Sequence, residues 1–254
     1  MEQEGYEATA ALSPRRTIGE VLLIVGVMVL YYLTRGVAIG RADDAVANAR
    51  GLVALEQRFD LFREPAIQAW FLHSHAAIHA MDWVYTYLHL PVLVAFAVWL
   101  YLRHQAWYAP FRNAFLVSAA CALVVYALFP VAPPRLMPEY GFVDTLAVYS
   151  AISYELHTIR LFYNPYAAMP SLHVGWSLLA GIGFFWLGRN ALLRLAGILL
   201  PLLMLCAVVI TGNHFFLDAL GGVCAVGAGF LVGFWTRLVD LWRSWRPAPS
   251  RTSY

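Results

Sequence analysis

Six long apolar runs, separated by shorter polar segments, dominate the pattern of this chain. A transmembrane helix needs about 20 residues to cross roughly 30 Å of hydrocarbon, and the runs reach or nearly reach that length. They predict an all-α membrane protein with a bundle of six transmembrane helices over residues 17–236. The runs cover about Ile18–Leu33, Val84–Leu102, Ala114–Pro130, Leu172–Leu187, Leu192–Ile210 and Phe215–Trp235.

The segment between the first two runs has a different pattern. Apolar residues recur near helical spacing, and charged residues fall on the other side. Glu64-Pro65 then begins a second helix, with proline in its first turn. Two amphipathic helices along the membrane surface are therefore expected. The apolar face of the first is Val46, Ala49, Leu52, Val53 and Leu55, and its polar face is Asp43, Asp44, Arg50 and Glu56.

The first run has an alternative interpretation as a signal peptide, because Ala45-Val46-Ala47 offers a small-residue cleavage pattern. That pattern falls late, beyond Arg35, Arg41 and two aspartates. A retained membrane span is therefore favoured.

Composition strengthens the membrane assignment. The chain is 61% hydrophobic and 13% charged, whereas soluble domains are about half apolar and about a quarter charged. All 17 basic residues are arginine, which excludes chemistry that needs a lysine nucleophile. The net charge of +2 is too small to indicate a nucleic-acid partner.

Arginines in the short connecting segments indicate the orientation. With six spans, the two ends of the chain and the two short loops after the second and fourth spans, all of which carry arginines, fall on one side. This predicts cytoplasmic tails at residues 1–16, expected to be disordered, and 237–254. Residues 40–79, 131–170 and 211–214 then face outward. The arginines are Arg15, Arg16, Arg103, Arg112, Arg189, Arg194, Arg237, Arg243, Arg246 and Arg251.

One outward-facing stretch places two ionisable residues at the start of the sixth run. His214 and Asp218 are four residues apart, so a helix puts them on one face, one turn apart. Ionisable groups near the centre of a bilayer cost roughly 2.5–3.5 kcal/mol each and usually mark a function. The alternative is a histidine capped by an aspartate at the membrane interface.

Two further polar stretches border the spans on the same side. Prolines after the third run hold Arg135 near the surface, where a guanidinium can bind phosphate or simply extend to water. Ser171 can cap the fourth helix, and His173 lies in its first turn, where an anion is favoured. His173 and His214 can therefore face each other across one pocket.

These motifs resemble those of the type 2 phosphatidic acid phosphatase superfamily, over about Glu64 to Trp235. Pro170-Ser171-Leu172-His173 is similar to its second motif, normally Pro-Ser-Gly-His, and His214-x-x-x-Asp218 matches the third. Met169 before the second motif and the Pro-Pro pair before Arg135 look more like the inositol phosphorylceramide synthase branch.

The resemblance implies a role for each matching residue. His214 would attack phosphorus to give a phosphohistidine, and Asp218 would hold its tautomer. His173 would protonate the leaving oxygen and then activate the acceptor, while Arg135 would clamp the phosphate. It implies no metal ion or other cofactor, since arginine and helix N-termini carry the charge stabilisation.

Two departures remove cations that the family commonly has. Leu128 occupies the lysine position of the first motif, and Ala207-Val208 replaces the Ser-Arg pair that begins the third. Arg160 is a candidate replacement, and Asn213 and Tyr163 are candidate hydrogen-bond donors. The missing arginine also fits the sphingolipid-synthase branch, which lacks that pair.

A second histidine cluster lies ahead of the second run. His75, His79 and Asp82 would share a helix face and could bind a divalent metal. A histidine-rich interface helix is the favoured interpretation.

The expected function is a lipid phosphate or pyrophosphate phosphatase at the outer face of the cell membrane. One alternative moves an inositol-phosphate-type head group to a lipid alcohol, and another is a non-catalytic membrane scaffold. The expected partners are a phosphorylated lipid substrate and membrane lipids, without nucleic acid; the oligomeric state is left open.

Overall fold

A computed structural model describes residues 14–35, 40–149 and 165–244, and this part of the chain is helical, with one isolated bridge between Val131 and Ala167. The predicted all-α class is confirmed. The elements are α2 (Pro14–Arg35), α3 (Ala42–Arg58), α4 (Glu64–Phe71), α5 (His75–Trp83), η2 (Val84–Leu88), α6 (His89–Arg103), α7 (Gln105–Leu128), η3 (Pro134–Leu136), η4 (Pro138–Tyr140), α8 (Thr145–Val148), α10 (Leu172–Leu187), α11 (Ala191–Ile210), α12 (Phe216–Gly233) and α13 (Trp235–Ser244).

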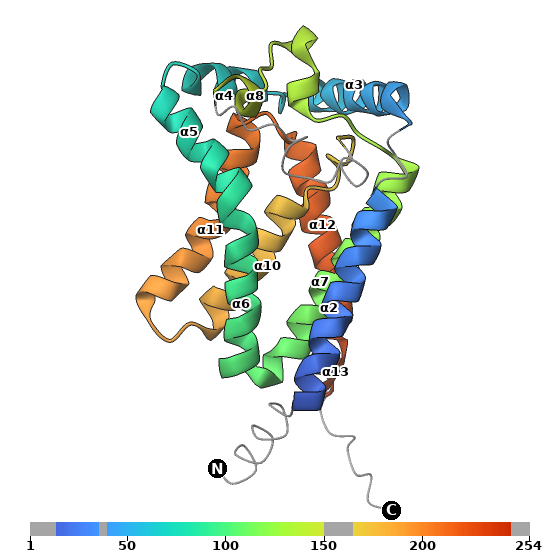
Figure 1. The fold of residues 1–254 in the computed structure, drawn as a ribbon, viewed down its shortest axis with the longest axis vertical. Coiled ribbons are helices and arrows are strands. Elements are labelled where there is room, and N and C mark those ends of the chain that lie inside the picture. Colours follow the sequence, from blue (N-terminus) through green and yellow to red (C-terminus); the bar gives the residue numbers. More distant parts are fainter. Residues whose placement is uncertain (1–13, 36–39, 150–164, 245–254) are drawn as a thin grey trace, which may run out of the picture.

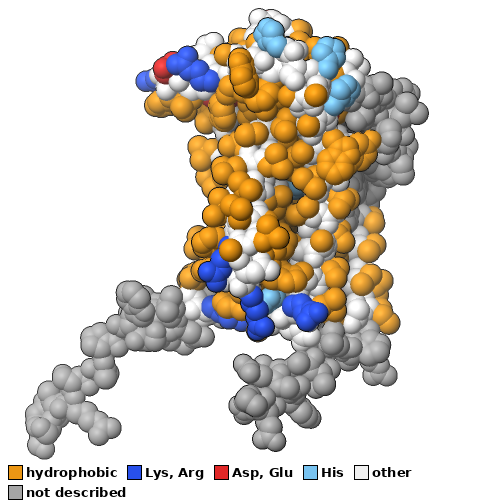
Figure 2. Space-filling view, turned by 90° about the vertical axis from the view of Figure 1, so that its left-hand side faces the viewer, with side chains coloured by type: hydrophobic (Ala, Val, Ile, Leu, Met, Phe, Trp, Pro, Cys, Tyr) orange, Lys and Arg blue, Asp and Glu red, His pale blue; other side chains and the backbone are white. Residues whose placement is uncertain are grey.

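Four helical stretches are long and apolar enough to cross a membrane: His75–Arg103, Gln105–Leu128, Ala191–Ile210 and Phe216–Gly233. The first joins α5, η2 and α6, so it begins nine residues before the predicted Val84. The sequence did not predict this start, because the polar residues of α5 interrupt the apolar run. Shorter apolar helices are present in α2 and α10, and a count of six spans stays a prediction. Figure 2 shows apolar side chains covering the middle of the molecule, which is the surface expected to face lipid.

The bundle is built around α12, which packs against α7 and α10, while α10 also packs against α11. Helix α2 runs beside α7 (Figure 1) and is tied to its neighbours at one end. There Arg112 pairs with Glu20, and the hydroxyl groups of Thr17 and Tyr101 lie 2.7 Å apart. The opposite end of the bundle is covered by α3, α4 and α8.

Glycines set how closely α10 and α12 approach. A Cβ atom on Gly222 of α12 would overlap the carbonyl oxygen of Ser171, and one on Gly175 of α10 would lie 2.7 Å from the carbonyl oxygen of Gly222. Small residues allow such backbone contact between membrane helices. These contacts bring the starts of α10 and α12 together.

Helix α3 differs from its predicted faces at two positions. Ala49, Leu52 and Val53 are buried as expected, but Leu55 is 42% exposed. Glu56, assigned to the polar side, is fully buried. Its polarity suggested a solvent-exposed position, but its carboxylate is buried because it accepts a hydrogen bond from the backbone N–H of Leu217. α3 therefore docks onto the bundle as well as lying across its end.

Arginines gather at the other end of the bundle (Figure 2). Helix α13, which extends into the predicted tail, places the Arg237 guanidinium 4.0 Å from the ring centre of Trp107. Arg237 also donates to the carbonyl of Ala106 at 2.5 Å. These contacts join α13 to the first turn of α7. The side of the membrane that this end faces stays a prediction.

Gly222→Ala should destabilise the protein by about 1–3 kcal/mol, because the new methyl group forces α10 and α12 apart. Gly227→Ala is the matched control, since a Cβ atom there meets nothing within 4 Å. Thermal unfolding in detergent should show a lower midpoint for Gly222→Ala only. Equal midpoints for the two variants would contradict the packing argument.

Candidate active site

The turn between α11 and α12 positions His214. Gly212 has a positive φ of 68°, a conformation that glycine adopts without steric cost. The carbonyl of Val208 accepts hydrogen bonds from the backbone N–H groups of Asn213 (2.8 Å) and His214 (3.2 Å). The turn thus folds back onto the end of α11, and His214 is held immediately before α12.

His214 and Asp218 lie on one face, as their spacing predicts. Nδ1 of His214 is 3.6 Å from Oδ2 of Asp218, and both side chains are buried. Oδ2 of Asp218 also accepts from the backbone N–H of Phe215 at 2.9 Å. One carboxylate therefore binds the start of the helix and lies beside the imidazole, although 3.6 Å is slightly longer than a hydrogen bond.

The start of α10 lies against this pair. Ser171 caps α10, with its hydroxyl oxygen accepting from the N–H of Val174 at 3.5 Å, and its own N–H donates to the carbonyl of Asp218 at 2.8 Å. The ring centres of His173 and His214 are 5.7 Å apart. The two predicted histidines are thus brought together by direct backbone contact between their helices.

His173 is enclosed by two rings from the span His75–Arg103. Tyr85 stacks on it and His89 lies tilted against it, each with ring centres 4.6 Å away. Nδ1 of His89 is 3.3 Å from the hydroxyl of Ser177. Sequence reasoning missed His89, although an ionisable residue inside an apolar run is itself a signal of function.

Arg135 reaches the same turn. Its Nε donates to Oδ1 of Asn213 at 3.1 Å, and its Nη1 lies 3.4 Å from Oδ2 of Asp144. Its backbone N–H donates to the carbonyl of Gly212 at 2.7 Å. The side chain is only 7% exposed, so the alternative of an arginine extended into water is wrong.

Three buried polar residues from the covering helices hold the site, and the sequence did not reveal them. Oε1 of Glu56 accepts from the N–H of Leu217, and Oε1 of Glu64 accepts from the N–H of Phe216, each at 2.8 Å. Gln68 donates to the carbonyls of Val143 (3.0 Å) and Ile210 (3.1 Å). Helices α3 and α4 are therefore part of the site's framework.

Other predicted residues lie elsewhere. Arg160 and Tyr163 fall outside the described residues. Leu128, at the family's lysine position, is 73% exposed, and Val208, at its arginine position, is fully buried. Neither side chain is a cation, so these two positions contribute no positive charge to the site.

The second histidine cluster does not form a metal site in the part of the chain that is described, where no group of three or more ligating side chains meets. Asp82 is buried and accepts a 2.7 Å hydrogen bond from Thr145 of α8. His75 packs edge-on against Tyr149 instead. The metal alternative is therefore not supported.

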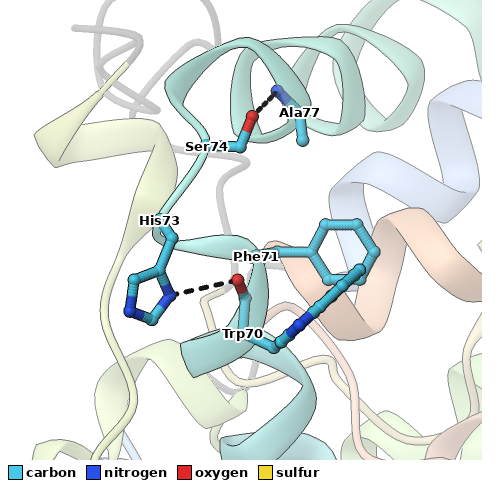
Figure 3. Close-up of a pocket in the computed structure, with 5 residues that line it drawn as sticks. All are labelled: Trp70, Phe71, His73, Ser74 and Ala77. Carbon is cyan, nitrogen blue, oxygen red and sulfur yellow. Dashed lines mark hydrogen bonds between the residues drawn. The ribbon is translucent and has the colours of Figure 1, made fainter.

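A surface pocket of about 580 Å³ opens where α4 meets α5. Its lining residues do not include the histidines of the site (Figure 3). His73 there lies with Nδ1 3.2 Å from the carbonyl oxygen of Trp70. The pocket is separate from the His173–His214 arrangement.

Fold and site together define a helical membrane protein with two histidines, an aspartate and an arginine gathered at one end of its bundle. The chain belongs to the PAP2 superfamily, whose family model matches residues 50–232. Members are generally phosphatases or phosphotransferases, which supports an enzyme acting on a phosphorylated lipid. No curated protein and no solved structure gives a significant match.

His89→Ala should lower turnover of a phosphorylated lipid by about tenfold or more, because His173 loses a ring that fixes its position. His89→Phe keeps a ring there and should retain most of the activity. Tyr87→Ala is the control, since Tyr87 belongs to the same segment but is 43% exposed. The comparison is of kcat in detergent or liposomes, and full activity in His89→Ala would rule out the positioning role.

Proposed function

We propose that this protein transfers phosphoryl groups from a phosphorylated lipid through a covalent phosphohistidine at His214. The observation that carries the proposal is the convergence of His214, His173 and Asp218: ring centres 5.7 Å apart and an Nδ1–Oδ2 distance of 3.6 Å. A nucleophile, a second histidine and an orienting carboxylate are the parts that two-step phosphoryl transfer requires.

In the first step, Nε2 of His214 attacks phosphorus while the bond from phosphorus to the leaving oxygen breaks. Protonated His173 gives its proton to that oxygen. In the proposed reaction Asp218, whose Oδ2 lies 3.6 Å from Nδ1 of His214, moves closer and accepts the Nδ1–H. The attacking nitrogen is then the unprotonated one, and the positive charge formed on the ring is stabilised.

In the second step, neutral His173 takes a proton from the acceptor hydroxyl as its oxygen attacks the phosphohistidine. The bond from phosphorus to nitrogen breaks, and both histidines return to their starting states. With water as acceptor the product is a free phosphate, and with a lipid alcohol it is a new phosphodiester or phosphomonoester.

The proposed charge stabilisation comes from the chain itself. Arg135 is linked through Asn213 to the residue before His214, and the backbone N–H groups at the start of α10 lie beside His173. A guanidinium and a helix N-terminus both stabilise phosphate oxygens. The reaction proposed here is therefore independent of a metal ion.

Hydrolysis of a lipid phosphate or pyrophosphate is the leading reaction. Head-group transfer is the second candidate, supported by the replacement of the family's two cations by Leu128 and Val208. That loss fits the inositol phosphorylceramide synthase-like branch. Both reactions share the first step and differ only in the acceptor.

His214→Ala should lower turnover by about 10³-fold or more, because no covalent intermediate can form. His73→Ala, at the separate surface pocket, is the matched control. A substrate labelled in its phosphate should leave label on wild-type protein after an alkaline quench, and none on His214→Ala. Unchanged turnover in His214→Ala would exclude the mechanism.

An assay of the purified protein identifies the acceptor. Phosphatidate, a lipid pyrophosphate and phosphatidylinositol are each supplied with and without a lipid alcohol, and the products are measured. Release of phosphate without added alcohol supports the phosphatase. Product that forms only with the alcohol supports the transferase. No turnover under any condition would leave the scaffold alternative.

We further propose that the site faces the outside of the cell membrane, because the arginine-rich segments are assigned to the cytoplasmic side. After Cys121, Cys206 and Cys224 are replaced, Glu139→Cys near the site and Ala191→Cys at the other end provide single thiols. A membrane-impermeant maleimide added to intact cells should label Glu139→Cys only. The reverse pattern would invert the topology.

A further inference from the structure

We infer that Glu56 and Glu64 share one proton and form a hydrogen-bonded acid pair that positions the start of α12, and with it His214. The inference rests on the proposed function only for its activity measurement. Its stability measurement needs no substrate, so the two can fail separately.

The pair occupies one end of a helix where hydrogen-bond acceptors are needed. The first N–H groups of an α-helix have no partner within the helix. At α12, the N–H of Phe215 is bound by Asp218, that of Phe216 by Glu64 and that of Leu217 by Glu56. Three successive donors are thus satisfied by three carboxyl groups.

Each glutamate binds the start of α12 through one carboxyl oxygen. The second oxygen of each, which has no donor, indicates that the pair holds a proton. Oε2 of Glu56 and Oε2 of Glu64 are buried and have no hydrogen-bond donor among the described groups. The two carboxyl groups are neighbours, because their Oε1 atoms bind the N–H groups of the adjacent residues Leu217 and Phe216. Two ionised carboxylates would leave both oxygens unpaired and repelling. One proton between them satisfies both, as in other buried carboxyl pairs.

The charges around the pair favour the same state. Asp218 of α12 adds a third carboxylate, and His214 lies before it. Arg63 and Asp60, in the turn between α3 and α4, pair with each other at 2.6 Å and are exposed. Burial, followed by the hydrogen bond from Glu64, raises the pKa of Glu56 from 4.5 to about 9.

Retaining this proton matters for the site. Three ionised carboxylates beside His214 would repel an incoming phosphate and push α3 and α4 away from α12. A pair with a single negative charge still accepts both N–H groups and is favoured by the helix dipole. Glu56 and Glu64 are therefore positioning residues, and neither is placed to touch the substrate.

The pH dependence follows from the direction of the shift. Because the folded-state pKa of Glu56 lies above its usual 4.5, the folded protein holds an extra proton between about pH 4.5 and about 9. The stabilisation is full below the lower value and is lost as the pH rises through the upper one.

Glutamine substitutions distinguish a pair that holds one proton from two carboxylates that are both ionised. In Glu56→Gln, the amide oxygen can still accept from Leu217, and the amide N–H can donate to Oε2 of Glu64 at every pH. Its activity at neutral pH should stay within about threefold of wild type, and its activity relative to wild type should rise toward pH 9. Taking the ratio removes any contribution of His173 to the pH profile.

Glu64→Gln should behave in the same way, whereas Glu56→Gln/Glu64→Gln leaves two amide donors facing each other without an acceptor. The double variant and Glu56→Leu should lose about tenfold or more in kcat, with little change in KM. Glu139→Gln, at an exposed glutamate, is the control.

Thermal unfolding in detergent tests the pair without substrate. The wild-type midpoint should fall between about pH 6 and about 9.5 by more than that of Glu56→Gln. The inference is overturned if Glu56→Gln is as unstable as Glu56→Leu, or if the double variant matches the single ones. If these stability results hold but His214→Ala keeps full turnover, the proposed function fails and the acid pair stands.

Discussion

The start of α12 is the point on which the rest of the structure depends. A helix that begins inside protein at the end of a membrane bundle has donors that water cannot satisfy, and each unpaired group is costly. Here carboxyl groups from α3, α4 and α12 itself bind the N–H groups of three consecutive residues. The residue immediately before them is His214. The need to satisfy a buried helix end and the need to fix a histidine are therefore met by the same contacts.

A second constraint joins the two histidine-bearing helices. The contact of Gly222 with the carbonyl of Ser171, and the hydrogen bond from Ser171 to Asp218, put the beginnings of α10 and α12 in register. Small residues allow the backbones to touch, and the capped ends then share a hydrogen bond. The chain belongs to the PAP2 superfamily, and the two histidines that resemble those of its second and third motifs lie at these two helix starts.

Local rules predicted the parts of this arrangement that depend on neighbouring residues. The spacing of His214 and Asp218, the cap at Ser171 and the start of α4 at Glu64 all follow from a few residues of sequence. The helical class followed from the apolar runs. Span ends were less secure, because the helix that contains α6 begins in α5, where polar residues such as His79 and Asp82 interrupt the apolar pattern.

Long-range contacts account for what the sequence did not reveal. Glu56 looked like a solvent-facing residue, and its partner at Leu217 lies 161 positions away. His89 was absorbed into an apolar run, and its place beside His173 depends on how α6 meets α10. Arg160 and Tyr163 lie outside the described residues, so their assignment to the site stays a prediction.

The docking of α3 and α4 has a consequence for building hybrid proteins. A segment that merely lay on the lipid surface could be exchanged between relatives as an independent module. Here Glu56 and Glu64 must arrive together with the backbone of residues 215–217 that they bind. The region that can be transplanted intact is therefore the whole stretch from α3 to α12, and grafting its two histidine motifs alone would leave the recipient's helix without its acceptors.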